Sequence, residues 1–117
     1  MERPPVTPEV MERQASFHAD IVQEVAEAVR TEPVVVVGMS VNPHVKRARS
    51  ALDKAGIAYR YIEHGGYHNR WKERLALKIW AGWPTFPQVF VKGTLVGGAD
   101  QTEAMLASGD LQKLLEG

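Results

Sequence analysis

Residues 83–100 read WPTFPQVFVKGTLVGGAD, and their strand and turn signals are the basis for predicting the fold. Two short apolar runs, Gln88–Val91 and Leu95–Val96, are separated by Lys92-Gly93-Thr94. A short turn that contains glycine between two apolar runs is typical of a β-hairpin. The stretch therefore predicts two antiparallel strands in the C-terminal third of the chain.

A helix signal follows the hairpin directly. Gly97-Gly98 ends the second strand, and Asp100 followed by Glu103 matches a capping box in which aspartate replaces serine or threonine. The apolar residues that come after it predict a C-terminal helical region, which Gly109 interrupts. We therefore expect Asp100 to cap the last helical region.

Upstream of the hairpin, strand and helix signals alternate. The β-branched run Val34–Val37 predicts a strand that is buried on both faces. Asn42-Pro43 predicts a helix start, since asparagine caps free N–H groups and proline suits the first turn, and Gly56 ends that helix. Ile57–Ile62 predicts a second strand, and residues 69–80 predict a further helix.

The N-terminal part has a helical pattern of its own after a proline-rich arm. Residues 8–30 predict one amphipathic helix with Thr7 as its N-cap. Its apolar stripe consists of Val10, Phe17, Ile21, Val25, Ala28 and Val29. This stripe either packs on the chain's own sheet or contributes to a homodimer. We divide the chain into an arm with an added helix, residues 1–32, and a main domain, residues 33–117.

The element order is helix, strand, helix, strand, helix, hairpin, helix. A strand–helix–strand unit with a right-handed crossover, followed by a helix and an antiparallel hairpin, predicts an α/β fold of the thioredoxin type. The chain has 117 residues, which is enough for one domain with one modest core. The sequence contains no run of about 18 apolar residues, which a membrane-spanning helix would need. It also shows no secretory signal, so we expect a cytoplasmic protein.

Composition excludes several classes of function. The chain has 14 basic residues (Lys plus Arg) and 14 acidic residues (Asp plus Glu), so its formal net charge is zero. This balance argues against a protein that binds nucleic acid by neutralising phosphates, and against a basic protein of the membrane surface. The cysteine count is zero. This chain alone therefore supplies no disulfide, no thiolate metal ligand and no thiol nucleophile. His64 and His68 are four apart, but Gly65-Gly66 lies between them and a third ligand is not evident, so we expect no metal site.

The motifs Trp83–Gly93 and Leu95–Asp100, with the helix segments Lys46–Ala48 and Leu52–Ile57, resemble the glutaredoxin family, and the first two are most similar to its monothiol members. The resemblance extends from Val34 to Glu116 and implies a thioredoxin-like fold of the glutaredoxin type, with an extra N-terminal helix.

The chain departs from that family where the family's chemistry takes place. Asn42-Pro43-His44-Val45 stands where glutaredoxins carry a Cys-x-x-Cys or Cys-Gly-Phe-Ser motif. Met39 stands where family members carry a lysine that helps to lower the thiol's pKa and holds a glutathione carboxylate. Thiol–disulfide exchange and iron–sulfur cluster assembly both need the thiolate, so the resemblance carries neither activity over.

The resemblance implies a binding surface that needs little sulfur. Thr85, Phe86 and Pro87 match a loop whose proline is cis in the family and which pairs with extended glutathione by β-augmentation. Gly98, Ala99 and Asp100 match the loop that holds the γ-glutamyl carboxylate, and backbone N–H groups at a helix start suit an anion. Arg74 and Lys78 match basic positions that hold the glycyl carboxylate.

These observations favour a redox-inactive binding module that takes glutathione, a peptide or a protein partner and has no catalytic residue. One alternative is a glutathione-dependent oxidoreductase or transferase that activates a bound thiol near Asn42 and His44. Another alternative is a structural or regulatory subunit with an empty groove. The alternative without a ligand gives these residues structural roles only: Pro87 shapes a turn, Asp100 caps a helix and Arg74 is solvated.

Overall fold

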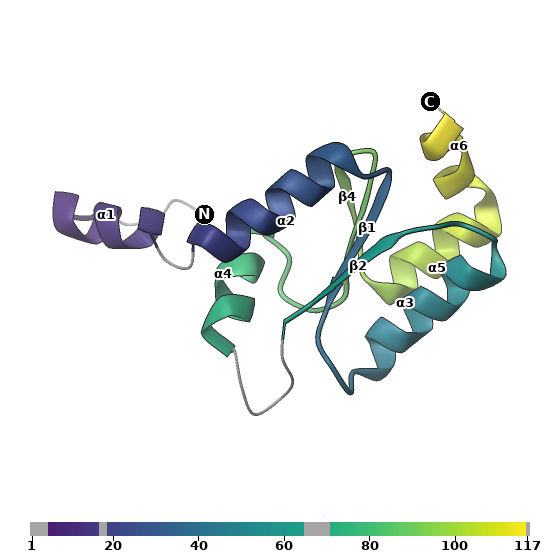
Figure 1. Cartoon of the computed structure of the whole chain (residues 1–117), viewed down its shortest axis with the longest axis horizontal. Coiled ribbons are helices and arrows are strands. Elements are labelled where there is room, and N and C mark those ends of the chain that lie inside the picture. The colour runs from purple at the N-terminus through teal and green to yellow at the C-terminus, as the bar shows by residue number, and fades with distance from the viewer. Residues whose placement is uncertain (1–4, 17–18, 65–70, 117) are drawn as a thin grey trace.

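A computed structural model describes residues 5–16, 19–64 and 71–116 of the chain. Six helices and four strands occur in these residues (Figure 1). In chain order they are α1 (Pro8–Ser16), α2 (Ala19–Thr31), β1 (Val34–Gly38), α3 (Pro43–Lys54), β2 (Arg60–Glu63), α4 (Trp71–Ala81), β3 (Gln88–Val91), β4 (Thr94–Gly97), α5 (Ala99–Ser108) and α6 (Asp110–Glu116).

The strands form one mixed sheet in the order β2-β1-β3-β4. Strand β1 pairs in parallel with β2 and antiparallel with β3, and β3 pairs antiparallel with β4. Val36 lies opposite Tyr61 on one side and Val89 on the other, which places β1 in the interior of the sheet. The predicted hairpin and the thioredoxin-like α/β fold are confirmed.

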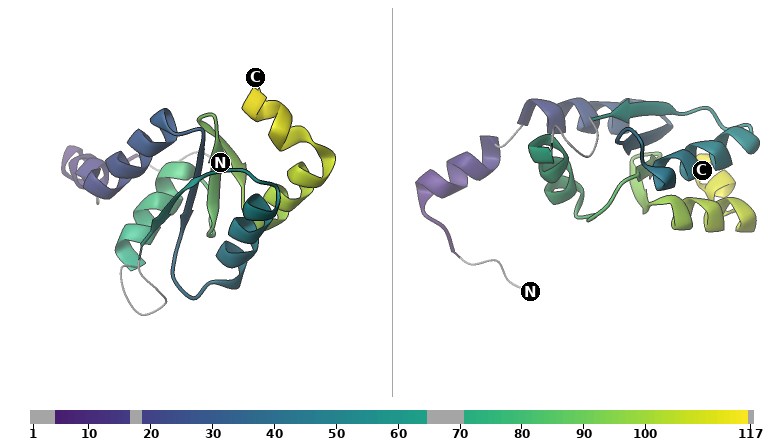
Figure 2. Two further views of the ribbon diagram at one scale, coloured as in Figure 1. Left: turned by 45° about the vertical axis from the view of Figure 1, so that its right-hand side comes forward. Right: turned by 90° about the horizontal axis from the view of Figure 1, so that it is seen from below.

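Helices cover both faces of the sheet (Figures 1 and 2). Alternate valines of β1 serve the two cores: Val35 and Val37 pack with buried residues of α2 and α4, whereas Val34 and Val36 pack with those of α3, α5 and α6. All four side chains expose 1% or less. The unbroken β-branched run is therefore explained, because both faces of this strand are buried.

Helix α3 begins and ends as its sequence predicts. Pro43 is its first residue after the cap Asn42, and Gly56 follows its end with a φ of +71°. The second strand is shorter than expected, because the Ile57 N–H donates to the Leu52 carbonyl at 3.0 Å and so completes the end of α3. Pairing with β1 starts only near Arg60.

Two helices, α1 and α2, are described where the sequence predicted one over residues 8–30. Thr7 caps α1, since its Oγ1 accepts from the Val10 N–H at 3.3 Å, while Phe17 and His18 lie outside the described residues. The buried part of the apolar stripe belongs to α2, whose Val25, Ala28 and Val29 pack in the core beside β1. The α2 part of the stripe thus packs on the chain's own sheet, whereas Val10 on α1 is exposed. The boundary between residues 32 and 33 stays a prediction.

The cap of α5 differs from the prediction. Gly98, not Asp100, is the N-cap, and its N–H donates to Oε1 of Gln101 at 3.0 Å. The Thr102 hydroxyl donates to the Gly98 carbonyl at 2.8 Å. Asp100 lies inside the first turn instead. Gly109, with a φ of +83°, separates α5 from α6 as expected.

None of the described helices combines the length and the apolar character that crossing a membrane requires.

Candidate functional site

Asn42 is held at the start of α3 by the helix backbone. Its Oδ1 accepts from the His44 N–H at 2.9 Å and from the Val45 N–H at 3.2 Å. The first N–H groups of a helix lack intrahelical partners and form the positive end of the helix dipole. Donors that could stabilise an anion here are therefore engaged by the chain's own neutral side chain.

Two neighbours of Asn42 shape the loop between β1 and α3. Met39 exposes only 7% of its surface and packs in the core with residues of α2 and α4. Val41 exposes 86% and has a φ of +57°, a backbone conformation that is uncommon for a β-branched residue. Met39, which stands where glutaredoxins carry a lysine, is thus an apolar residue of the core.

A groove with a volume of about 270 Å³ lies between this helix start and the β3 side of the sheet. It is lined by Thr85, Phe86 and Pro87 from one loop, by Gly98, Ala99, Asp100 and Gln101 from the start of α5, and by His44 and Trp83. The Phe86–Pro87 peptide bond is cis. The structure therefore brings together the two loops that the sequence analysis singled out.

Gly97 and Gln101 set the shape of one groove wall. Gly97 has a φ of +118°, and a Cβ on it would lie 2.9 Å from Cγ of Gln101. Only glycine adopts this backbone without strain. Sequence reasoning missed Gln101, although a glutamine three residues after Gly98 is the spacing of a capping box. Trp83, which the sequence analysis predicts as a core or groove-wall residue, lines the groove.

Arg74 and Lys78, the two basic residues predicted to bind a ligand carboxylate, do not line the groove. Arg74 exposes 7%, and its Nη1 donates to the His64 carbonyl at 3.1 Å, so it joins α4 to the residue that follows β2. The Lys78 ammonium lies 5.7 Å from the ring centroid of Phe86, within range of a cation–π contact. Their contact with a ligand carboxylate stays a prediction.

A charged cluster joins α3 to α5 at the rim of the groove. Arg47 forms ion pairs with Asp100 and Glu103. Hydrogen bonding from Arg47 holds the pKa of the Asp100 carboxyl below its usual range, and both acidic partners raise the pKa of Arg47. The predicted capping pair, Asp100 and Glu103, thus binds one arginine instead of closing the helix start.

Arg47 also sets the chemistry of His44. Its Nη1 lies 3.2 Å from Nδ1 of His44. Because a guanidinium can only donate, Nδ1 accepts, and a neutral ring then carries its proton on Nε2. His44 therefore lines the groove with one ring nitrogen engaged by Arg47.

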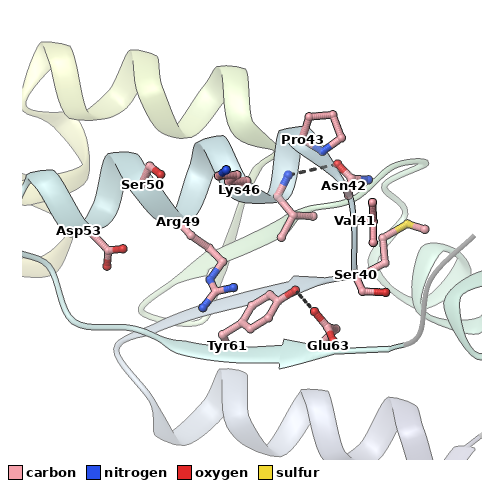
Figure 3. Close-up of a pocket in the computed structure, with 12 residues that line it drawn as sticks. Ser40, Val41, Asn42, Pro43, Lys46, Arg49, Ser50, Asp53, Tyr61 and Glu63 are labelled. Carbon is pink, nitrogen blue, oxygen red and sulfur yellow. Dashed lines mark hydrogen bonds between the residues drawn. The ribbon is translucent and has the colours of Figure 1, made fainter.

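A larger pocket of about 640 Å³ lies behind the loop, between α3 and β2 (Figure 3). Arg49 lies 3.9 Å above the Tyr61 ring, and the Tyr61 hydroxyl donates to Glu63 at 2.9 Å. Burial and this bond to Glu63 raise the pKa of Tyr61 to about 12. Sequence reasoning missed this pocket. Arg49 and Glu63 are thus engaged by tyrosine side chains. We place the candidate site in the smaller groove, because that groove brings together the two loops that the sequence motifs predict.

No cluster of three or more His, Asp or Glu side chains suited to a metal ion occurs within the described ranges. The pair His64 and His68 is not tested, because His68 lies outside them.

The glutaredoxin family model matches residues 43–96. A glutaredoxin-like protein from Dictyostelium discoideum is 45% identical over 82% of this chain and 78% of its own length. Among solved structures, oxidised glutaredoxin 2 from Chlamydomonas reinhardtii superposes with a TM-score of 0.71 at 30% identity, covering 84% of this chain and 92% of its own. A buckwheat glutaredoxin–glutathione complex gives a TM-score of 0.73 at 26% identity, covering 90% and 93%.

The solved glutaredoxin structures share the fold of this chain, and the sequence relative covers most of its length. The chain therefore belongs to the glutaredoxin family.

Proposed function

We propose that this chain is a redox-inactive, glutaredoxin-related binding module that recognises glutathione or a similar extended peptide through the groove beside Pro87. The observation that carries the proposal is the pairing of an occupied helix start with an open groove. Asn42 accepts hydrogen bonds from the N–H groups at the start of α3. The two loops Thr85–Pro87 and Gly98–Asp100 line the groove next to this helix start.

The absence of exchange chemistry follows from the atoms available. Thiol–disulfide exchange requires a thiolate that attacks a sulfur atom and a sulfur that leaves. The chain has no cysteine, and the amide of Asn42 is neither acidic nor a soft nucleophile. The contact of Arg47 with Nδ1 of His44 occupies one of the two ring nitrogens that could take a proton from a bound thiol, and this disfavours a transferase that activates glutathione by proton abstraction.

Several groups support ligand binding in the groove. The first N–H groups of α5 have no intrahelical acceptor, and Ala99 and Asp100 line the groove at that helix start. Such a helix start favours a carboxylate. A protein with this fold, the buckwheat glutaredoxin, is solved as a glutathione complex, which makes this tripeptide the first ligand to test.

The buried Met39 limits the affinity. A charge-assisted hydrogen bond contributes about 1.5–3 kcal/mol, so a chain without a cation at this position should bind roughly 10- to 100-fold more weakly than one that has it. We expect weak, reversible binding, with reduced, oxidised and S-methylated glutathione all binding because none needs to react.

Titration calorimetry with these three ligands tests the proposal. The substitution Thr85→Arg places a bulky side chain on the groove wall, and Thr94→Arg places the same side chain on β4 as a matched control, since both threonines are exposed. We expect Thr85→Arg alone to abolish the binding heat. A wild-type chain that gives no heat with any of the three ligands contradicts glutathione recognition and leaves a structural or regulatory role.

A further inference from the structure

Helix α1 lacks a packing surface among the described residues. Every residue from Thr7 to Arg13 is exposed, including Val10 at 42% and Met11 at 60%. Figures 1 and 2 show α1 extending away from the sheet beyond α2. A helix of nine residues is marginal in water by itself, because the unfavourable first turn is followed by few further hydrogen bonds. Packing against another surface would stabilise it.

The two sides of α1 differ in character. At helical spacing, Val10 and Met11 lie on one side, and Glu9, Glu12 and Arg13 lie on the other. Glu9 and Arg13 form an ion pair at 3.3 Å. Two acidic residues against one basic residue give this helix an apolar side with an acidic border.

Helix α4 presents the complementary face. Leu75 and Ile79, one turn apart, expose 39% and 55% of their surfaces. Lys72 and Lys78 flank them at helical spacing, and the buried Arg74 adds a third positive charge to the helix against Glu73 alone. This α4 face, defined by Leu75, Ile79, Lys72 and Lys78, is therefore apolar with a basic border.

We propose that α1 of one copy packs on the α4 face of a second copy, and that the same contact is made in reverse. A two-fold dimer needs each chain to carry both halves of the contact, and this chain carries both. Acidic residues of α1 then meet lysines of α4, which favours this pairing over contact between two α1 helices. The proposal does not depend on ligand binding in the groove.

The contact differs from a dimer formed through the apolar stripe of the N-terminal helical region. In α2, the stripe residues Val25, Ala28 and Val29 are buried against the chain's own sheet, and Ile21 is partly buried there, so this part of the stripe offers little surface to a partner. Among the described residues of this region, the exposed large apolar side chains are those of Val10 and Met11 on α1.

Sedimentation velocity of the full chain over a wide range of concentrations tests the dimer. The variants Met11→Glu and Ile79→Glu each remove one apolar side of the contact, and Ala104→Glu on the exposed surface of α5 is the matched control. Because each residue would be buried twice in a two-fold dimer, we expect the dissociation constant to rise by at least about tenfold in the first two variants. The control should match the wild type.

Amide hydrogen exchange of α1 provides a second readout. The proposal expects protection that appears as the dimer forms and is lost in both contact variants. A wild type that stays monomeric at all concentrations, or a dimer that survives both Met11→Glu and Ile79→Glu, overturns it. Protection of α1 in a monomer would assign the α4 face to the same chain and would equally overturn it.

Discussion

Replacing Asn42 by alanine tests how the site is built. The change removes the acceptor of two hydrogen bonds, at 2.9 Å from the His44 N–H and 3.2 Å from the Val45 N–H. Both donors lie at a half-exposed helix start, so water replaces the lost acceptor in part. Substitution of an asparagine N-cap by alanine lowers the free energy of unfolding by about 1 kcal/mol. For a chain of this size we expect the melting temperature to fall by about 3–5 °C.

Urea unfolding followed by circular dichroism measures the effect, with Asn42→Asp as the paired variant. Aspartate keeps a capping oxygen and adds a negative charge at the positive end of α3, so it should be at least as stable as the wild type near neutral pH. Equal unfolding free energies for the wild type and Asn42→Ala would refute the assignment of Asn42 as the group that occupies this helix start. A strongly destabilised Asn42→Asp would refute it as well.

Further predictions concern the rim of the groove and Asn42, which stands where glutaredoxins carry the cysteine. Gly97→Ala should lower the unfolding free energy by more than about 1 kcal/mol, because its φ is +118° and its Cβ would meet Gln101 at 2.9 Å; urea unfolding measures this, and an unchanged midpoint would argue against the strained turn. Arg47 lowers the pKa of Asp100, so their pairing stabilises the fold above the ordinary carboxyl pKa of about 4 and this contribution is lost as the pH falls through the lowered value. Arg47→Gln should therefore flatten the acid side of the stability–pH profile, and an unaltered profile would contradict the pairing. Asn42→Cys should give a thiol whose pKa lies below about 8.5, because the N–H groups at the start of α3 favour the thiolate; the pH dependence of its alkylation rate tests this, and an ordinary pKa would show that the helix start no longer presents those donors.

Local signals in the sequence predict most of the fold. The hairpin follows from the glycine turn between two apolar runs, and the strand Val34–Val37 follows from four adjacent β-branched residues that are buried on both faces. The cap at Asn42 is equally local, because its acceptor and its two donors lie within three residues of one another. Features of this kind need no knowledge of the tertiary structure.

The misses arise from contacts between residues that are distant in the sequence. Asp100 looks like a helix cap, yet it binds Arg47, which is 53 positions away, and this leaves Gly98 and Gln101 to close the helix start. Arg74 carries a charge that suggests exposure, but the fold buries it against a backbone carbonyl. Neither outcome is encoded in local periodicity, since each depends on which helices become neighbours.

The composition of the site could likewise be predicted only in part. The two loops at Thr85–Pro87 and Gly98–Asp100 were identified through motifs, and the structure brings both to one groove. The contact between Arg47 and His44 depends on side-chain placement at the helix start, for which the sequence carries no local signal.

A chain that binds glutathione without exchanging electrons should leave a glutathionylated peptide intact. Turnover of such a peptide by the purified wild-type chain, in the presence of reduced glutathione, measures this. We predict the rate of the uncatalysed reaction at every protein concentration, because no residue of the chain can form the mixed disulfide. A rate that rises in proportion to the concentration of the chain, and that Thr85→Arg abolishes, would contradict the account.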